Sequence, residues 1–147
     1  MPKRKSRKVR RKKNPRTKLI EKLDKVLFEI LLYERGERCE ICGGSQQLGL
    51  FHILPKGRFQ RIRFNKQNVL IAGWYCCHYL WHHDFYIARD RIAPKIRELR
   101  GENYEIELRQ IDLTAPPLTE LYLKTLLKAL EKERDALERG WQSGKCT

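Results

Sequence analysis

The residues best suited to chemistry are concentrated in one stretch of the chain, between Cys39 and His83. This stretch contains four of the five cysteines and all four histidines. Thiolates and imidazoles are the ligands that zinc and other transition metals take in proteins. Their concentration in one part of a chain that is otherwise rich in charged residues predicts a metal site.

The first two cysteines, Cys39 and Cys42, are three positions apart and are followed by Gly43 and Gly44. This spacing is typical of a zinc knuckle, in which glycines let the backbone amides turn toward the sulfurs. A redox pair would stand at the start of a helix that follows a strand, and the residues before Cys39 do not predict that arrangement. We therefore expect Cys39 and Cys42 to bind a structural zinc ion.

The second two cysteines, Cys76 and Cys77, are adjacent, and Trp74 stands where the earlier cysteine of a regular knuckle would fall. Neighbouring side chains point in different directions. We therefore expect Cys77 to be the third zinc ligand and Cys76 to contribute little. A tetrahedral structural zinc takes four protein ligands, so the fourth is either Cys76 or a nearby histidine.

The histidines form a second candidate site. His78 and His82 are four positions apart, so on a helix both imidazoles face one side and can share a divalent cation, with His83 as the alternative second ligand. A solvent-exposed, histidine-rich helix is the other interpretation. His52 lies in an apolar segment, where a single histidine is usually a packing residue. The three downstream histidines favour a functional role for it.

The order of these residues resembles that of the HNH (ββα-metal) nucleases. The knuckle is followed by His52 at the end of an apolar segment, then by Asn68, then by the pattern C-H-x-x-W-H from Cys77 to His82. The layout over residues 37–110 is similar to that of NinG (Rap)-like phage recombination endonucleases and related phage HNH proteins. The resemblance implies an α+β fold with a zinc-knuckle ββα-metal core over residues 37–90. It also implies a metal-dependent endonuclease that hydrolyses DNA phosphodiester bonds, at branched or recombining DNA, in the host cytoplasm if a phage encodes it.

The resemblance also implies roles for individual residues. His52 would be the general base that takes a proton from the attacking water. Asn68 would hold the loop between the hairpin and the helix in place and orient His52. His78, with His82 or His83, would hold Mg²⁺ or another divalent ion. A base and a cation are what hydrolysis of an unactivated phosphodiester requires.

One position departs from the family pattern. Many HNH nucleases carry an acid or a second histidine immediately before the base, but this chain has Phe51 there, which cannot coordinate a metal. Two protein ligands then remain for the catalytic ion, and Asp84 is a candidate for an additional one.

Positive charge is concentrated at the amino terminus. Residues 1–18 contain eleven of the 32 basic residues and no acid, whereas the other 129 residues hold 21 basic and 18 acidic residues. Such a run repels itself and cannot form a core, so we expect residues 1–17 to be a disordered tail. Opposite a polyanion it gains affinity by counterion release, which favours contact with nucleic acid over a solubility or localisation role. The residues expected to contact phosphates are Lys3, Arg4, Lys5, Arg7, Lys8, Arg10, Arg11, Lys12 and Lys13.

Four further basic residues lie in or next to the turn of a predicted hairpin, whose strands we expect over 48–54 and 61–71: Lys56, Arg58, Arg61 and Arg63. The resemblance implies that they hold the nucleic-acid backbone, although each could equally be ordinary surface charge. The sequence does not distinguish DNA from RNA.

Hydrophobic periodicity predicts one domain over residues 18–147. The expected elements are a helix over 18–35, strands over 48–54 and 61–71 with a break at 65–67, a helix from about 76 to Pro94, a short helix over 92–100, and a last helix from Thr114 to about Arg139 within a helical region over 91–140. Residues 104–113 fit either a strand or a short helix. The apolar stripes of the first and last helices predict core packing, with a homodimer seam as the alternative.

No apolar run approaches the roughly 18 residues of a membrane span, and the basic start does not resemble a signal peptide, so we expect a cytoplasmic protein without membrane contact. Clustered cysteines suit a reduced compartment. Two other functions fit the sequence: a non-catalytic zinc-knuckle protein that binds nucleic acid, and a structural or assembly protein with a nucleic-acid-binding tail.

Overall fold

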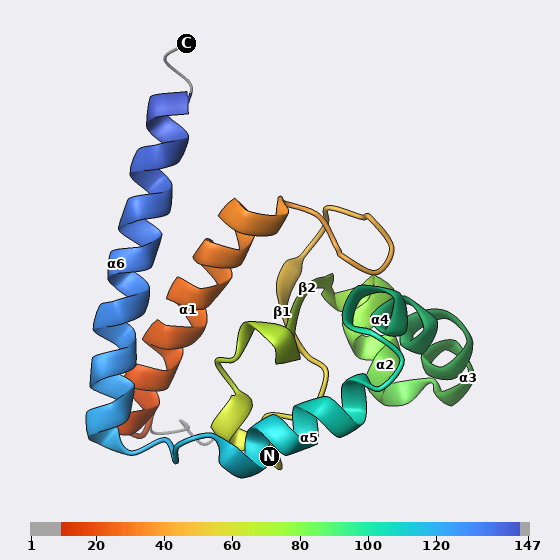
Figure 1. Cartoon of the computed structure of the whole chain (residues 1–147), viewed down its shortest axis with the longest axis horizontal. Coiled ribbons are helices and arrows are strands. Elements are labelled where there is room, and N and C mark those ends of the chain that lie inside the picture. Colours follow the sequence, from red (N-terminus) through yellow and green to blue (C-terminus); the bar gives the residue numbers. More distant parts are fainter. Residues whose placement is uncertain (1–9, 145–147) are drawn as a thin grey trace, which may run out of the picture.

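The computed structural model describes residues 10–144 and combines helices with one two-stranded sheet, which agrees with an α+β class (Figure 1). The elements in chain order are α1 (Pro15–Arg35), β1 (Leu48–His52), the 3₁₀ turns η1 (Gln60–Ile62) and η2 (Lys66–Asn68), β2 (Val69–Gly73), the π-helical turn η3 (Trp74–His78), α2 (Tyr79–His83), α3 (Phe85–Ile87), the π-helical turn η4 (Ala88–Ile92), α4 (Ala93–Arg100), α5 (Tyr104–Thr114) and α6 (Glu120–Gly144).

Helix α1 begins three residues earlier than periodicity predicts, so residues 15–17 are helical and do not belong to a tail. The reason is local: the Asn14 side chain accepts a hydrogen bond from the Thr17 amide at 2.8 Å, and Pro15 occupies the first turn. The helix ends at Gly36 as expected, with φ of +88°. Residues 10–14 form no regular element, and residues 1–9 lie outside the described part of the chain.

Strands β1 and β2 form an antiparallel hairpin in which Leu48 pairs with Gly73 and His52 with Val69. The strand expected over 61–71 is therefore wrong for its first eight residues. The two 3₁₀ turns, η1 and η2, lie there instead, joined by residues 63–65. Asn65 caps the second turn by accepting a hydrogen bond from the Gln67 amide at 2.9 Å. The apolar residues that suggested a strand, Ile62 and Phe64, are buried in two different cores.

The hairpin separates two hydrophobic cores, one on each face of the sheet. Val69 and Ile71 face α1 and α6, whereas Leu70 and Ala72 face the knuckle, α4 and α5. All five residues of β2 are buried because both faces are covered. The hairpin is thus a rigid centre from which the loop residues and the η3–α2 segment project.

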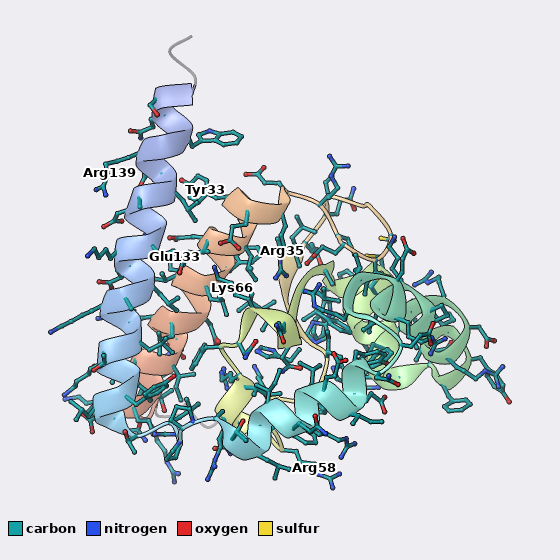
Figure 2. The ribbon with its side chains drawn as sticks, in the orientation of Figure 1. Tyr33, Arg35, Arg58, Lys66, Glu133 and Arg139 are labelled. Carbon is teal, nitrogen blue, oxygen red and sulfur yellow. The ribbon has the colours of Figure 1, made fainter. Side chains whose placement is uncertain are left out.

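Helices α1 and α6 lie side by side and run in the same direction (Figure 1). Arg16 at the start of α1 donates to the Leu118 carbonyl just before α6, and the rings of Tyr33 and Trp141 near the other ends are 6.3 Å apart. Lys66, in the loop between the strands, pairs with Glu34 at 2.7 Å and also with Glu133 (Figure 2). The apolar stripes of both helices are therefore used within one chain, as the core-packing interpretation expects.

Helix α6 differs in detail from the prediction. It begins at Glu120, after the two prolines, because the Thr119 hydroxyl accepts a hydrogen bond from the Tyr122 amide at 3.2 Å, and it continues to Gly144 instead of stopping near Arg139. The apolar spacing of the last helix predicts a buried stripe that includes Leu121, but Leu121 is 76% exposed, whereas Leu123 is fully buried. The buried stripe runs through Leu123, Leu126 and Leu130, and Leu121 lies two positions from Leu123, on the opposite side of the helix.

The segment after β2 is broken into short helical turns. The apolar residues of this segment predict one broad buried face that includes Tyr79, Phe85 and Tyr86. These side chains are 45%, 70% and 68% exposed, so that prediction is wrong. Asp84 ends α2 and caps the next turn by accepting a hydrogen bond from the Ile87 amide at 3.0 Å, so the face is not continuous. The segment left open at 104–113 is the helix α5. Within residues 10–144, no helix combines the length and the apolar character that a membrane crossing needs.

Candidate functional site

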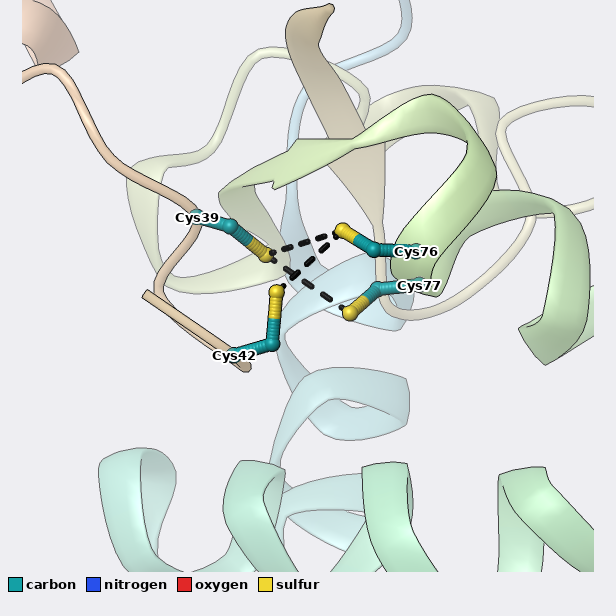
Figure 3. A group of neighbouring side chains, drawn as sticks. All are labelled: Cys39, Cys42, Cys76 and Cys77. Atoms are coloured by element: carbon teal, nitrogen blue, oxygen red, sulfur yellow. Dashed lines mark hydrogen bonds between the residues drawn. The ribbon is translucent and has the colours of Figure 1, made fainter. Parts of the chain in front are cut away.

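The four central cysteines converge at one point (Figure 3). Cys39 and Cys42 come from the turn after α1, and Cys76 and Cys77 come from η3. Their Sγ atoms all lie within 4.8 Å of one another, with 3.2 Å between Cys42 and Cys76 and 3.7 Å between Cys39 and Cys77. Zinc–thiolate bonds of about 2.3 Å arranged as a tetrahedron put sulfurs about 3.8 Å apart. The four cysteines could therefore hold a metal ion such as zinc.

The expectation that Cys76 is marginal is wrong, because its sulfur belongs to the cluster as closely as that of Cys77. The two residues lie in a π-helical turn, closed by a hydrogen bond from the Tyr79 amide to the Trp74 carbonyl. Adjacent side chains in a helical turn diverge by about 100°, so both can reach a point between them. In a strand they would point to opposite faces. No histidine is needed to complete the set of four.

Two glycines make room for the cluster. Gly43 turns the knuckle with φ of +78°, which only glycine adopts without strain. A Cβ on Gly73 would lie 2.5 Å from the Cys76 sulfur, so a side chain there would displace it. The knuckle is also tied to β2, because Glu40 and Ile71 exchange two hydrogen bonds of 2.8 Å and 2.6 Å.

Ionisation in the cluster is uneven. Burial opposes it, yet backbone amides, foremost that of Cys42, lower the pKa of Cys39 from 9.0 to about 7. Burial and contact with the Cys42 thiol raise the pKa of Cys76 to about 11, and burial with the neighbouring thiols also raises the pKa of Cys77. Several thiolates this close together repel one another, and a bound cation would replace that repulsion by attraction. Metal binding here must therefore release protons.

Three histidines meet around a second feature, a cavity of about 340 Å³ between the end of β1, the following loop and the η3–α2 segment. His52, His78 and His82 line it together with Lys56 and Trp74. The rings of His78 and His82 are 5.2 Å apart, as their four-residue spacing predicts.

Two residues offered as alternatives lie elsewhere. His83 is not among the cavity residues, and its ring stacks on Tyr79 at 4.3 Å. Asp84 is also outside the cavity lining, and its carboxylate caps the next turn. His82 is therefore the better placed partner for His78.

The hydrogen bond of His52 determines its tautomer. Its Nε2 lies 3.0 Å from the Arg63 carbonyl oxygen, which can only accept, so Nε2 carries the proton and Nδ1 keeps its lone pair. The residue is 7% exposed, and this burial lowers its pKa from 6.5 to about 4. At neutral pH His52 is an uncharged imidazole with one nitrogen available to accept a proton.

Asn68 fixes the chain next to His52. It is fully buried, and its side-chain amide exchanges hydrogen bonds with both backbone groups of Leu54, at 2.8 Å and 3.2 Å. Its own carbonyl accepts from the Ile53 amide at 2.8 Å. Asn68 thereby closes the loop over residues 53–68 and holds the backbone that follows His52, without contacting the imidazole itself.

The ring of Phe51 fills the space beside the helical histidines. It is fully buried and lies edge-on to His78, with 5.4 Å between centroids, and 5.7 Å from Trp81.

Burial, followed by the charges of His82 and Lys56, lowers the pKa of His78 to about 4. Burial likewise lowers the pKa of His82. Neutral imidazoles are the form that binds a cation.

The basic residues divide into exposed and engaged ones. Arg58 and Arg61 are exposed on the loop and line a hollow of about 350 Å³ with Arg16, a residue that the sequence interpretation missed. Arg63 instead pairs with Asp24 of α1 at 2.7 Å and is part-buried.

The tail leads into the same region. Arg10, Arg11, Lys12 and Lys13 are exposed and immediately precede α1, whereas Lys3, Arg4, Lys5, Arg7 and Lys8 lie outside the described residues. Lys56 lines the histidine cavity, while Arg58 and Arg61, a few residues later, line the arginine hollow. Basic residues of this loop therefore lie both at the histidine cavity and at the hollow that Arg16, near the start of α1, also lines.

Comparison with known proteins identifies no relative: no family model, curated protein or solved structure matches this chain. Its function is therefore inferred from the geometry of the cysteine cluster and the histidine cavity.

Proposed function

We propose that this protein is a metal-dependent endonuclease of the HNH (ββα-metal) type, with a structural zinc in the cysteine cluster. The observation that carries the proposal is the meeting of His52, His78 and His82 at one cavity, where a β-hairpin joins a helical segment. A buried histidine with a fixed tautomer beside a pair of neutral histidines is an arrangement that core packing does not require.

In this proposal His52 is the general base. Its Nε2–H is held by the Arg63 carbonyl, so Nδ1 is the nitrogen that takes a proton from an attacking water. His78 and His82 would hold a divalent cation, which when bound neutralises charge on the scissile phosphate and the leaving 3′ oxygen. Lys56, which lines the same cavity, would contact an adjacent phosphate oxygen.

The cysteine cluster would serve this site by position. Cys77 and His78 are consecutive residues of η3, and the knuckle bonds directly to β2. A zinc held by all four cysteines would therefore fix the start of the helical segment against the hairpin, and with it the distance between His52 and His78.

The substrate is proposed to be DNA, with branched or recombining DNA as the form that the family resemblance suggests. The exposed basic residues along the tail and loop favour a polyanion, and they favour it without regard to sequence. RNA shares this backbone chemistry and is one arm of the test.

The decisive experiment compares wild-type protein with His52→Ala and His83→Ala on supercoiled plasmid, a four-way junction and a structured RNA, each with Mg²⁺, Mn²⁺ or Ni²⁺. We expect His52→Ala to reduce cleavage at least about 100-fold because it removes the base. His83→Ala is the matched control, since its ring lies outside the cavity, and it should keep most of the activity. Zinc content should be unchanged in both variants.

One observation favours a second function, a non-catalytic zinc protein that binds nucleic acid. The residue before His52 is Phe51, which has no acidic side chain and is fully buried against His78. Among the described residues that line the cavity, His78 and His82 are then left to hold a cation. Tight binding of nucleic acid without cleavage under any of the three metals would support that function and contradict the nuclease.

A further inference from the structure

Two exposed aromatic side chains, Trp74 and Tyr79, lie next to each other at the edge of the histidine cavity, and Trp74 is the one that lines it. The Trp74 ring lies 4.7 Å from that of His78. Tyr79 follows, with its centroid 6.4 Å from that of Trp74. Each side chain is 45% exposed, although tryptophan is highly buried on average. Tryptophan and tyrosine side chains that stay exposed beside a polar cavity are available to contact a ligand.

Both rings are held in place. The Trp74 amide donates to the Gln47 carbonyl at 3.1 Å, which anchors the start of η3 to the segment before β1. The Trp74 ring packs edge-on against His78, and the Tyr79 ring stacks on His83 with 29° between their planes. These contacts fix the ring orientations while leaving almost half of each side chain open to solvent. A ligand would therefore meet preformed flat surfaces.

The chemistry around the rings indicates what kind of ligand fits. Lys56 and the two cavity-lining histidines of η3–α2 provide one positive charge and several polar nitrogens, which suit a phosphate. The Trp74 ring in the cavity wall and the Tyr79 ring beside it offer flat surfaces that suit a nucleobase, which stacks on tryptophan and tyrosine whatever its identity. In a duplex the faces of the bases are already stacked on one another. Only an unpaired base can offer its face to a protein ring.

We infer that Trp74 and Tyr79 form a stacking rim for an unpaired nucleobase next to the cleaved phosphate. The substrate class is therefore single-stranded or locally unpaired nucleic acid, such as a flap or the unpaired arm of a branch, and not continuous duplex. Cleavage at this rim rests on the proposed function. Recognition of the unpaired base does not, and the two can be tested separately.

The binding test uses the full chain with His52→Ala as background, so that bound nucleic acid is not cut. A fluorescein-labelled single strand of about 12 nucleotides and a hairpin duplex of the same composition are titrated, and anisotropy gives each Kd. Trp74→Ala should weaken single-strand binding about tenfold, the effect expected when one stacking ring is removed, and change duplex binding less than about twofold. Trp74→Phe should restore most of the affinity.

Phe85→Ala is the matched control. Phe85 is 70% exposed, against 45% for Trp74, so the variant removes an exposed aromatic ring that does not line the cavity. It should leave single-strand binding close to that of the His52→Ala background. Zinc content and thermal unfolding confirm that each variant folds. Equal weakening of single-strand and duplex binding in Trp74→Ala, or no weakening of either, would overturn the stacking rim.

The cleavage test separates the two proposals. Wild-type protein that cuts a flap and a continuous duplex at equal rates, with dependence on His52, supports the nuclease and overturns the stacking rim. Binding of the single strand that depends on Trp74, with no cleavage under any metal, supports the rim and contradicts the nuclease. Faster cutting of the flap, reduced by Trp74→Ala and restored by Trp74→Phe, supports both.

Discussion

At the scale of single residues, burial and one hydrogen bond fix the protonation state and the tautomer of His52. The Arg63 carbonyl holds the proton on Nε2, and burial keeps the ring neutral above its lowered pKa of about 4. Asn68 affects His52 indirectly, because it forms hydrogen bonds with the backbone of Leu54 and not with the imidazole. We therefore regard His52 as the candidate catalytic residue and Asn68 as a positioning residue.

The lowered pKa of His52 predicts that acid destabilises the fold. Its pKa is about 4 when folded and 6.5 when exposed, so between these values the unfolded chain binds more protons and stability rises with pH. The stabilisation is fully present above pH 6.5 and decreases as pH falls toward 4, with a contribution of at most about 3 kcal/mol. Urea unfolding at each pH measures it.

Acid also displaces metal from thiolates, so the informative quantity is the difference between wild type and a variant at each pH. His52→Gln should make the dependence between pH 6.5 and 4 shallower, and the lowered pKa values of His78 and His82 account for the part that remains. His83→Gln, which changes a ring stacked on an exposed tyrosine, should leave it unchanged. Identical profiles for wild type and His52→Gln would show that His52 is not the group that titrates.

At the scale of elements, the π-helical turn η3 connects the two sites. It carries Cys76 and Cys77 toward the knuckle, His78 toward the cavity and Trp74 onto the cavity wall. A regular α-helical start would rotate these side chains relative to one another. The placement of these chemically distinct side chains within one short segment therefore depends on the geometry of a single turn.

Gly73, immediately before this turn, gives an element-scale prediction. Gly73→Ala would place a Cβ 2.5 Å from the Cys76 sulfur and 3.1 Å from the Gln46 carbonyl oxygen. We expect zinc affinity to fall about tenfold and the free energy of unfolding to fall by about 1–3 kcal/mol, because the turn must shift. Competition with a chromogenic zinc chelator and urea unfolding measure the two effects.

Gly49→Ala serves as the control in the same hairpin, since a Cβ there has no atom within 4 Å. It should leave zinc affinity unchanged. An unaltered zinc affinity in Gly73→Ala would mean that Cys76 is not a ligand, and that three cysteines with a further group hold the metal.

At the scale of the whole molecule, the hairpin is covered by separate cores on its two faces. The α1–α6 pair closes one face, and its ion pairs with the hairpin, including that of Lys66 with Glu34 at 2.7 Å, fix the sheet against it. The α4–α5 region closes the other face together with the knuckle. The basic tail leads into the end of α1 that carries Arg16. The tail residues next to α1 are therefore close in sequence to the arginine hollow.

The tail predicts a strong salt dependence of nucleic-acid binding. Deleting residues 2–13 removes nine basic residues, and the slope of log K against log salt should become shallower by about 0.9 for each of them that neutralises a phosphate. We expect the slope to decrease by several units while the requirement for metal in cleavage does not change. Affinity measured between about 50 and 300 mM KCl tests this.

A variant with glutamine at the same nine positions separates charge from length, and it should match the deletion. The fold should tolerate both changes, because the ion pair that they remove from the described part of the chain, between Lys13 and Glu21, is exposed and contributes little. A slope that stays at the wild-type value would show that the tail does not contact the nucleic acid.

The sequence by itself determined the features that depend on short spacing. The Cys39–Cys42 knuckle, the shared side of His78 and His82, the helix ending at Gly36 and the basic tail follow from neighbours within a few residues. Local geometry fixes such features before any tertiary contact forms. For the same reason, the sequence alone predicted a metal site in the stretch from Cys39 to His83.

Only the tertiary structure decided the features that depend on distant segments. It brought Cys76 into the cluster, because the π-helical turn and not the residue spacing sets the direction of that sulfur. It buried Ile62 and Phe64 in different cores, so the apolar pattern that suggested a strand came from two separate packings. It paired Arg63 with Asp24, and it placed His82 and not His83 beside His52. These outcomes depend on which face of each element meets a partner, and a local pattern does not contain that information.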